Sequence, residues 1–251
     1  METPRGQDDQ AARAEQTDPS APAEPAPVAT PPPRLPVMLR LTGRPCVVVG
    51  AGATGRRRAQ SLIDAGAQVR LIDPDASALV KAPPACETQA RPFAPADAEG
   101  AALVVAATDN PQVNHAVAQA ARQAGALVNR VDAPELGDVT FPATRRLGPA
   151  TVCVDSGGAS AAAARVLVEQ ALGAIDPAWI GLLHAAVQQR TRIQNKLPPG
   201  PARQRALAGL ADEGALRALQ SGGPDALANH YQSLLNATPD VARISATVER
   251  G

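Results

Sequence analysis

The stretch Gly50-Ala51-Gly52-Ala53-Thr54-Gly55 constrains the fold of this chain more than any other feature. It follows the apolar run Cys46–Gly50 and precedes a helical pattern over Thr54–Ala65. Between a strand and a helix, the first glycine of such a stretch permits a tight turn and the second admits a pyrophosphate. The third lets the helix pack close to the strand, and the helix N-terminus faces the anion. We therefore predict a βαβ dinucleotide-binding unit over residues 45–73.

The residue that ends the second strand of this unit bears on the choice of cofactor. Asp73 lies 18 residues beyond Gly55, where a carboxylate would accept a hydrogen bond from the ribose 2′-hydroxyl and repel a 2′-phosphate. This predicts NAD as the cofactor. The run Arg56-Arg57-Arg58 is either a solvated first helical turn or a set of phosphate contacts that would weaken the preference, so strict selection of NAD over NADP stays open.

Short Val-rich runs alternate with helical stretches over the first half of the chain. The predicted strands are Cys46–Gly50, Val69–Asp73, Leu103–Thr108 and Ala126–Val131, and the predicted helices are Thr54–Ala65 and Pro111–Ala124. Alternation of this kind is typical of a doubly wound parallel sheet. The predicted fold class is therefore α/β and Rossmann-like, followed by a small further segment and a C-terminal α-helical region.

The pattern changes after Pro134. Val139–Phe141 and Thr151–Val154 are predicted as two further strands, Ser160–Leu172 as a helix, and the chain reads as helical to about Ala237. Residues 1–34 are rich in proline and poor in large aliphatics, which predicts a disordered lead. The predicted division of the chain is 1–34 as lead, 35–141 as NAD-binding domain, 142–175 as a linking segment, 176–237 as helical domain and 238–251 as flexible tail.

Composition argues against several classes of protein. The 24 basic and 24 acidic residues balance, and aromatic residues make up only 2%, so nothing indicates a nucleic-acid partner. No apolar run is long enough for a membrane span, and the first ten residues do not resemble a signal peptide. The three cysteines show no spacing typical of a metal site or a disulfide framework. These features predict a cytoplasmic protein with no resident metal.

Asp132 is the strongest candidate for catalytic chemistry. It follows the apolar strand Ala126–Val131, and ligands of open α/β sheets bind beyond the carboxyl ends of the strands. Asp73, Thr108 and Asp109 are predicted at the same edge. Arg130, two residues earlier, shares a face with Asp132 and is placed to keep its carboxylate ionised. The alternative is that Asp132 only forms a turn before Ala133-Pro134.

The stretch Ser156-Gly157-Gly158-Ala159-Ser160 closes one predicted strand and opens the next predicted helix. It is either a glycine turn with Ser160 as N-cap or an anion-binding nest for a substrate carboxylate. The residues alone leave these two interpretations even.

Several segments, taken in order, resemble the N-terminal module of siroheme synthase and the free-standing precorrin-2 dehydrogenases. They are Leu35-Pro36-Val37 with Leu41, Val47–Gly52, Ala106-Ala107-Thr108-Asp109 with Val113-Asn114, Asn129 with Val131–Pro134, Phe141-Pro142-Ala143, and Ser156–Ser160. The resemblance covers residues 35–175, and residues 176–237 only in helical character.

The resemblance implies NAD-dependent oxidation of precorrin-2 to sirohydrochlorin, with Asp132 as general base. It implies substrate contacts at Asn129, Arg130, Ser156, Gly157 and Gly158. It further implies a homodimer in which residues 142–175 form the dimerisation segment. The expected cofactor contacts are Gly50, Gly52, Ala53, Thr54, Gly55, Asp73, Thr108 and Asp109.

The sequence leaves three properties of the protein open. Some relatives also insert iron or cobalt into sirohydrochlorin, and the sequence leaves such chelation undecided. The tetrapyrrole pathway is equally open. The competing interpretations are an NAD-linked oxidoreductase acting on another small substrate and a non-enzymatic NAD-sensing module.

Overall fold

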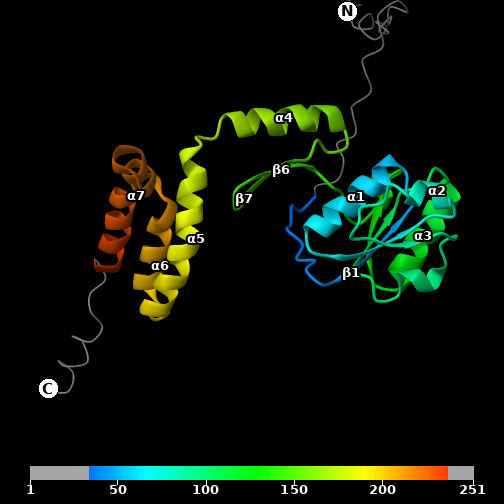
Figure 1. Cartoon of the computed structure of the whole chain (residues 1–251), viewed down its shortest axis with the longest axis horizontal. Coiled ribbons are helices and arrows are strands. Elements are labelled where there is room, and N and C mark those ends of the chain that lie inside the picture. Colours follow the sequence, from blue (N-terminus) through cyan, green and yellow to red (C-terminus); the bar gives the residue numbers. More distant parts are fainter. Residues whose placement is uncertain (1–33, 237–251) are drawn as a thin grey trace, which may run out of the picture. The chain divides into compact units, whose positions relative to one another are not determined.

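A five-stranded parallel sheet forms the first folded region of the computed structural model, which describes residues 34–236 (Figure 1). The strand order is β3-β2-β1-β4-β5. The first strand is therefore central, β2 and β3 are added on one side of it, and β4 and β5 on the other. The strands are β1 Pro45–Val49, β2 Gln68–Ile72, β3 Glu87–Gln89, β4 Leu103–Ala106 and β5 Leu127–Arg130. This arrangement confirms the predicted Rossmann-like α/β class.

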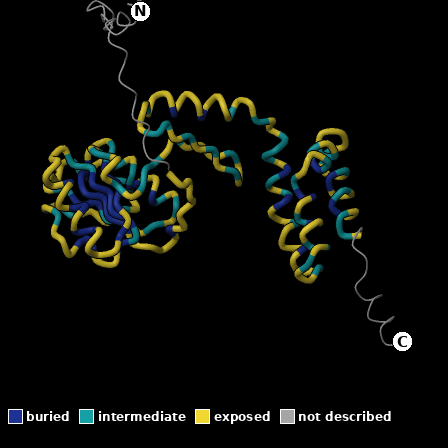
Figure 2. The backbone as a smooth tube through the Cα atoms, turned by 180° about the vertical axis from the view of Figure 1, so that it is seen from behind, coloured by how far each residue is buried: buried dark blue, intermediate teal, exposed yellow. Residues whose placement is uncertain are grey.

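Helices cover both faces of this sheet. The α1 helix, Ala53–Asp64, packs with Val48, Leu71 and Val105 on one face, and α3, Pro111–Gln123, packs with Val47 and Val104 on the other. Successive residues of a strand point to opposite faces, which is why a run of consecutive valines supplies both layers. Figure 2 shows these central strands as the most deeply buried part of the chain. Another short helix, α2 Ala76–Leu79, follows β2.

Two features of this region differ from the prediction. The edge strand β3 was not predicted, because Glu87-Thr88-Gln89 is short and polar. Val139–Phe141 was predicted to be a strand, which is wrong. The strand that pairs with β7, Ala150–Val154, is β6, Ala143–Leu147, and the two are joined through a turn at Gly148, where φ is +60°.

The β6–β7 hairpin packs against α4, Ala161–Gly173. Ala164 and Val168 are the buried residues of this helix, and Arg145 of β6 pairs with Glu169 at 2.5 Å. Ser160 is the N-cap, which was one of the two interpretations of this stretch, and its side chain accepts a hydrogen bond from the Ala163 N–H.

The C-terminal helices form a separate apolar cluster. Helices α5 Ala178–Lys196, α6 Pro201–Ala208 and α7 Glu213–Asn236 bury Leu182, Ile193 and Leu227 together. The Tyr231 hydroxyl donates to the Leu210 carbonyl at 3.0 Å. The α7 helix is kinked at Gly223, where φ is +64°, directly before Pro224. The predicted lead and tail lie outside the described residues, apart from Arg34.

No single helix within residues 34–236 has both the length and the apolar composition of a membrane span. Only α4 and α5 taken together pass that test, and they are bent by 81°.

Candidate active site

The glycine-rich turn joins β1 to α1 at the carboxyl edge of the sheet. Gly50 has φ +101°, and a Cβ there would lie 2.5 Å from the Ala107 carbonyl oxygen. A Cβ on Gly55 would lie 1.8 Å from the Gly50 carbonyl oxygen. Both glycines are therefore required by the backbone itself, as the strand–turn–helix prediction anticipated.

Gly52 differs, because a Cβ at this position would meet nothing within 4 Å. Gly52 is also the N-cap of α1, makes no side-chain cap hydrogen bond, and is followed by a first turn with no acidic residue. The free N–H groups of a helix N-terminus attract an anion. The open space and the uncapped helix start fit the pyrophosphate of a dinucleotide. Ala53 and Thr54 belong to the first turn, whose N–H groups would face this anion.

Asp73 lies directly after β2 and reaches back to this turn. Its Oδ2 accepts the Ala51 N–H at 2.6 Å, and its Oδ1 accepts the Asp75 N–H at 2.8 Å. Each carboxylate oxygen has a second lone pair. Asp73 therefore fixes the turn and keeps acceptor capacity for a ribose hydroxyl.

At the end of β4, Thr108 is held by a buried asparagine of α3. Thr108 Oγ1 donates to Asn114 Oδ1 at 2.7 Å, and Asn114 Nδ2 donates to the Thr108 carbonyl at 2.9 Å. Asn114 is completely buried, whereas Asp109 is exposed. No site role was predicted for Asn114. The feature that could have indicated one is a polar residue on the buried, alanine-rich face of α3.

Arg130 and Asp132 form a bidentate pair at the end of β5. Arg130 Nε lies 2.9 Å from Asp132 Oδ1 and Nη2 lies 2.5 Å from Oδ2, and Arg130 is only 5% exposed. Hydrogen bonding from Arg130 lowers the pKa of Asp132, burial opposes this effect, and hydrogen bonding from Asn114 adds to it. Asp132 is therefore ionised at neutral pH, in the geometry expected from the spacing of the two residues.

Asn129 lies on the opposite face of β5 from Arg130. It is 3% exposed, and its Nδ2 donates to the Val139 carbonyl at 2.8 Å. Its Oδ1 is buried and has no hydrogen-bond partner among residues 34–236.

The Ser156 turn makes a compact local structure. Gly157 and Gly158 have φ of +65° and +89°, and Ser156 Oγ accepts the Ser160 N–H at 3.1 Å. Among the described residues, no hydrogen bond links this turn to Asp132. Its proposed contact with substrate remains a prediction.

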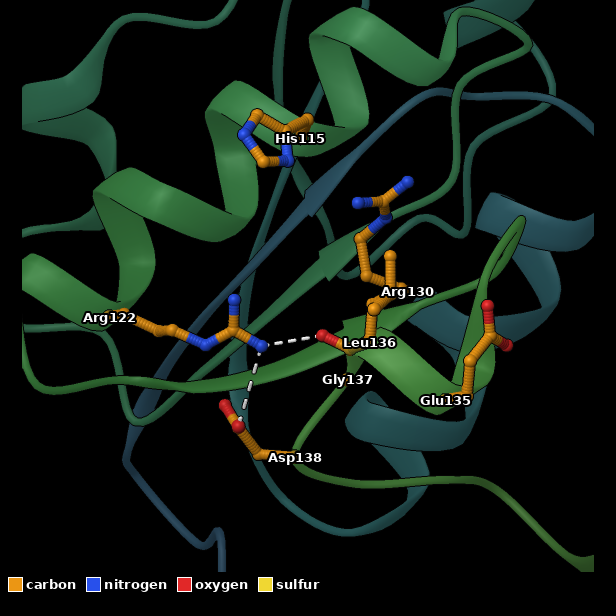
Figure 3. A pocket seen from close by; sticks show the side chains of 7 residues that line it. All are labelled: His115, Arg122, Arg130, Glu135, Leu136, Gly137 and Asp138. Carbon is orange, nitrogen blue, oxygen red and sulfur yellow. Dashed lines mark hydrogen bonds and ion pairs between the residues drawn. The ribbon is translucent and has the colours of Figure 1, made fainter. Parts of the chain in front are cut away.

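A cavity of about 370 Å³ lies between α3 and the loop after β5 (Figure 3). Arg122 donates to the Leu136 carbonyl and pairs with Asp138 at 3.6 Å, while the Arg130 side chain points away from Asp138. The cavity includes neither Asp132 nor the glycine turn, so its shape does not by itself mark the candidate site. Its lining consists of His115, Arg122, Arg130, Glu135, Leu136, Gly137 and Asp138.

Within residues 34–236, no three His, Cys, Asp or Glu side chains gather in an arrangement that could hold a metal ion.

Residues 37–143 match the protein family described as "Putative NAD(P)-binding". The match spans the glycine turn, Asp73 and Asp132. It confirms the predicted dinucleotide-binding domain and supports NAD as the cofactor.

Curated relatives include siroheme synthases of several bacteria. The protein of Methylococcus capsulatus is 38% identical over 190 residues, which are 73% of this chain and 40% of that protein. Siroheme synthase 3 of Aeromonas hydrophila is 34% identical over 207 residues, which are 81% of this chain and 44% of that protein. The chain thus spans less than half the length of these relatives.

Among solved structures, the chain is similar to "SirC, precorrin-2 dehydrogenase", with a TM-score of 0.64 and 21% identity. The similarity covers 80% of this chain and 98% of that one. It supports the fold beyond the dinucleotide-binding domain. The comparisons with siroheme synthases and with SirC confirm the resemblance that the sequence motifs indicated.

Proposed function

We propose that this protein oxidises precorrin-2 to sirohydrochlorin with NAD, and that Asp132 is the general base. The position of the Asp132 carboxylate supports this function most strongly. It lies at the carboxyl edge of the sheet, is held in a fixed position by Arg130, and belongs to the same domain as a turn built for a dinucleotide. The similarity to siroheme synthases and to SirC supports the choice of substrate.

The reaction removes one hydride and one proton from the substrate. NAD, when bound, supplies the hydride acceptor. The glycine turn and the first-turn N–H groups of α1 hold the pyrophosphate, and Asp73 accepts from a ribose hydroxyl. The Asp132 carboxylate accepts the proton and passes it to water, so that precorrin-2 and NAD⁺ give sirohydrochlorin, NADH and one proton.

The Arg130 pair makes Asp132 a weak base, because a carboxylate with a lowered pKa binds protons weakly. A weak base is sufficient here. Loss of a hydride leaves positive charge on the macrocycle, which makes the departing proton acidic, and an ionised carboxylate stabilises that charge.

Turnover tests the proposal directly. The full chain is incubated with precorrin-2 and NAD, and the absorbance of sirohydrochlorin is followed, with a sample lacking NAD as the control. We expect NAD-dependent product formation. Absence of product from the folded protein would overturn the proposed function.

Substitutions of two glycines separate cofactor binding from folding. Because the space beside Gly52 is open, Gly52→Ala should leave the melting temperature unchanged and weaken NAD binding at least tenfold by blocking the pyrophosphate. Gly55→Ala places a Cβ against the Gly50 carbonyl and should cost roughly 1–3 kcal/mol of stability or more. Calorimetric titration with NAD and thermal unfolding measure the two effects. Unchanged NAD affinity in Gly52→Ala would contradict this account of the turn.

We propose that the protein is a homodimer that uses α4. Val166 and Leu167 are 56% and 48% exposed on this helix, and an exposed apolar surface of this kind is typical of an interface. A groove of about 480 Å³ between β6 and α4, lined in part by Val166 and Arg165, adjoins it. We infer that residues 142–175 form the dimerisation segment.

Charge introduced into this surface tests the dimer. Val166→Glu/Leu167→Glu should convert the dimer into a monomer, because each carboxylate would lose its hydration in the interface. Light scattering coupled to size-exclusion chromatography gives the mass. Val80→Glu, at a residue 84% exposed after α2, is the control and should remain dimeric. A wild-type protein that is monomeric at micromolar concentration would refute the proposal.

We further propose a reducing, cytoplasmic setting. Cys46, Cys86 and Cys153 are all free, and burial raises the pKa of the Cys46 and Cys86 thiols, which makes these two unreactive.

A further inference from the structure

Two buried side-chain atoms lack a hydrogen-bond partner in the part of the chain that the structure describes, and they are complementary. One is the Arg58 Nε, a donor, and the other is the Asn129 Oδ1, an acceptor. Buried polar atoms in folded proteins nearly always have partners, so each exception needs an explanation.

Both atoms belong to side chains that contact the same short segment, Val139–Phe141. The Arg58 guanidinium carbon lies 4.4 Å from the centroid of the Phe141 ring, and Asn129 Nδ2 donates to the Val139 carbonyl. Asn129 is in register with Val105 of the neighbouring parallel strand, whose side chain lies in the cluster on the α1 face. Arg58 and Asn129 therefore lie on the same face of the sheet.

Arg58 has no carboxylate partner among residues 34–236, whereas the buried Arg130 is paired with Asp132. Burial lowers the pKa of Arg58 to about 10, and repulsion from Arg57 adds to the effect. The side chain remains charged at neutral pH. Only its Nε is fully buried, so its two terminal nitrogens keep accessible surface. A partly buried cation without an anion is costly, and binding an anion would offset that cost.

We propose that Arg58 binds a carboxylate of the tetrapyrrole substrate and that Asn129 positions it. The two terminal nitrogens form a fork that matches a carboxylate, and stacking on Phe141 fixes the plane of this fork. Asn129 Oδ1 then accepts from Nε–H, directly or through one water. This inference rests on the proposed function for the identity of the ligand.

The position of Arg58 favours a substrate carboxylate over the cofactor phosphates. Arg58 lies in the second turn of α1, past the first-turn N–H groups that suit a pyrophosphate. Its guanidinium is turned to Phe141. This ring is two residues from Val139, whose carbonyl accepts a hydrogen bond from Asn129 of β5. A carboxylate and a phosphate can both accept hydrogen bonds from a guanidinium, so the experiment has to distinguish the substrate from the cofactor.

The test compares Arg58→Gln with Arg58→Lys and with Arg44→Gln. Arg44 is exposed just before β1, at the amino edge of the sheet, so its substitution removes the same charge far from the proposed subsite. Steady-state kinetics give KM for precorrin-2 and for NAD separately. Fluorescence titration with uroporphyrin, a stable tetrapyrrole polycarboxylate, gives binding without turnover.

We expect Arg58→Gln to raise KM for precorrin-2 and the Kd for uroporphyrin by about tenfold or more, as for loss of a charge-assisted hydrogen bond. KM for NAD should stay within about twofold of the wild-type value, Arg58→Lys should recover part of the loss, and Arg44→Gln should match the wild type. A lower melting temperature with unchanged tetrapyrrole binding would show a structural role only and overturn the proposal. A rise confined to KM for NAD would overturn it in favour of a cofactor phosphate. Wild-type protein that binds uroporphyrin but does not turn over precorrin-2 would refute the proposed function and leave the subsite supported.

Discussion

Replacing Asp132 with asparagine should lower kcat for precorrin-2 oxidation by about 10²–10⁴, the range typical of a lost general base. Asparagine keeps the size of the side chain and still accepts a hydrogen bond from Arg130, but it has no charge with which to accept a proton. Because Asp132 lies outside the glycine turn, the Kd for NAD should not change. Single-turnover absorbance measurements at saturating substrate give the rate of the chemical step.

Asp138→Asn is the matched control for this substitution. Asp138 is also an aspartate beyond β5 that pairs with an arginine, and its Oδ2 accepts the Val128 N–H at 3.0 Å. It faces a different arginine, Arg122, so its substitution should affect stability more than kcat. If Asp132→Asn turned over at the wild-type rate, Asp132 would not be the base.

Replacing Arg130 with methionine should move the acidic limb of the pH–rate profile to higher pH. In the wild type, hydrogen bonding from Arg130 lowers the pKa of Asp132, so the carboxylate stays ionised well below neutral pH. Without the guanidinium, burial remains and raises the pKa of this carboxyl group. Activity should then be lost at a higher pH as Asp132 becomes protonated. The profile of kcat/KM against pH measures the shift.

Arg130→Met should also change how the stability of the protein depends on pH. A carboxyl group whose pKa is lowered by folding stabilises the protein above the pKa of the unfolded chain, and this contribution is lost as the pH falls through the lower, folded value. Arg130→Met should therefore remove a stabilising contribution that the wild type retains at neutral and mildly acidic pH. Arg122→Met removes a charge from the same cavity without touching Asp132, and its acidic limb should coincide with that of the wild type. An unchanged limb in Arg130→Met would contradict the role given to the pair.

The parallel sheet and the residues at the carboxyl ends of its strands could be predicted, because strong local sequence patterns mark them. Val-rich runs mark β1, β4 and β5, and glycines mark the turn, whose close backbone approaches permit no side chain at Gly50 or Gly55. Placement of Asp132 followed from the rule that carboxyl ends of parallel strands share one edge. Its pairing with Arg130 followed from the two-residue spacing.

The error at Val139–Phe141 has a physical cause. An apolar–polar–apolar triplet is typical of a strand, but here Val139 and Phe141 pack against the cluster on the α1 face as irregular chain. The true strand β6 carries Arg145 and Arg146, whose long polar side chains give little strand signal.

The role of Asn114 was not predictable for a different reason. Its hydrogen bonds join it to Thr108, and it also lowers the pKa of Asp132. Both residues are brought to it only by the folding of α3 onto the sheet. A role for Arg58 toward the substrate was not predicted either. The burial of its Nε and the stack on Phe141 indicate that role.

In the proposed reaction, the ionised carboxylate of Asp132 and a bound NAD together oxidise precorrin-2. The most direct measurement is a single-turnover reaction of the full chain with precorrin-2 and NAD, in which NADH and sirohydrochlorin are quantified together for the wild type and Asp132→Asn. We predict one NADH per sirohydrochlorin in the wild type, with a rate at least about a hundredfold lower in the variant. Sirohydrochlorin formed without NADH, or equal rates in the two proteins, would contradict this account.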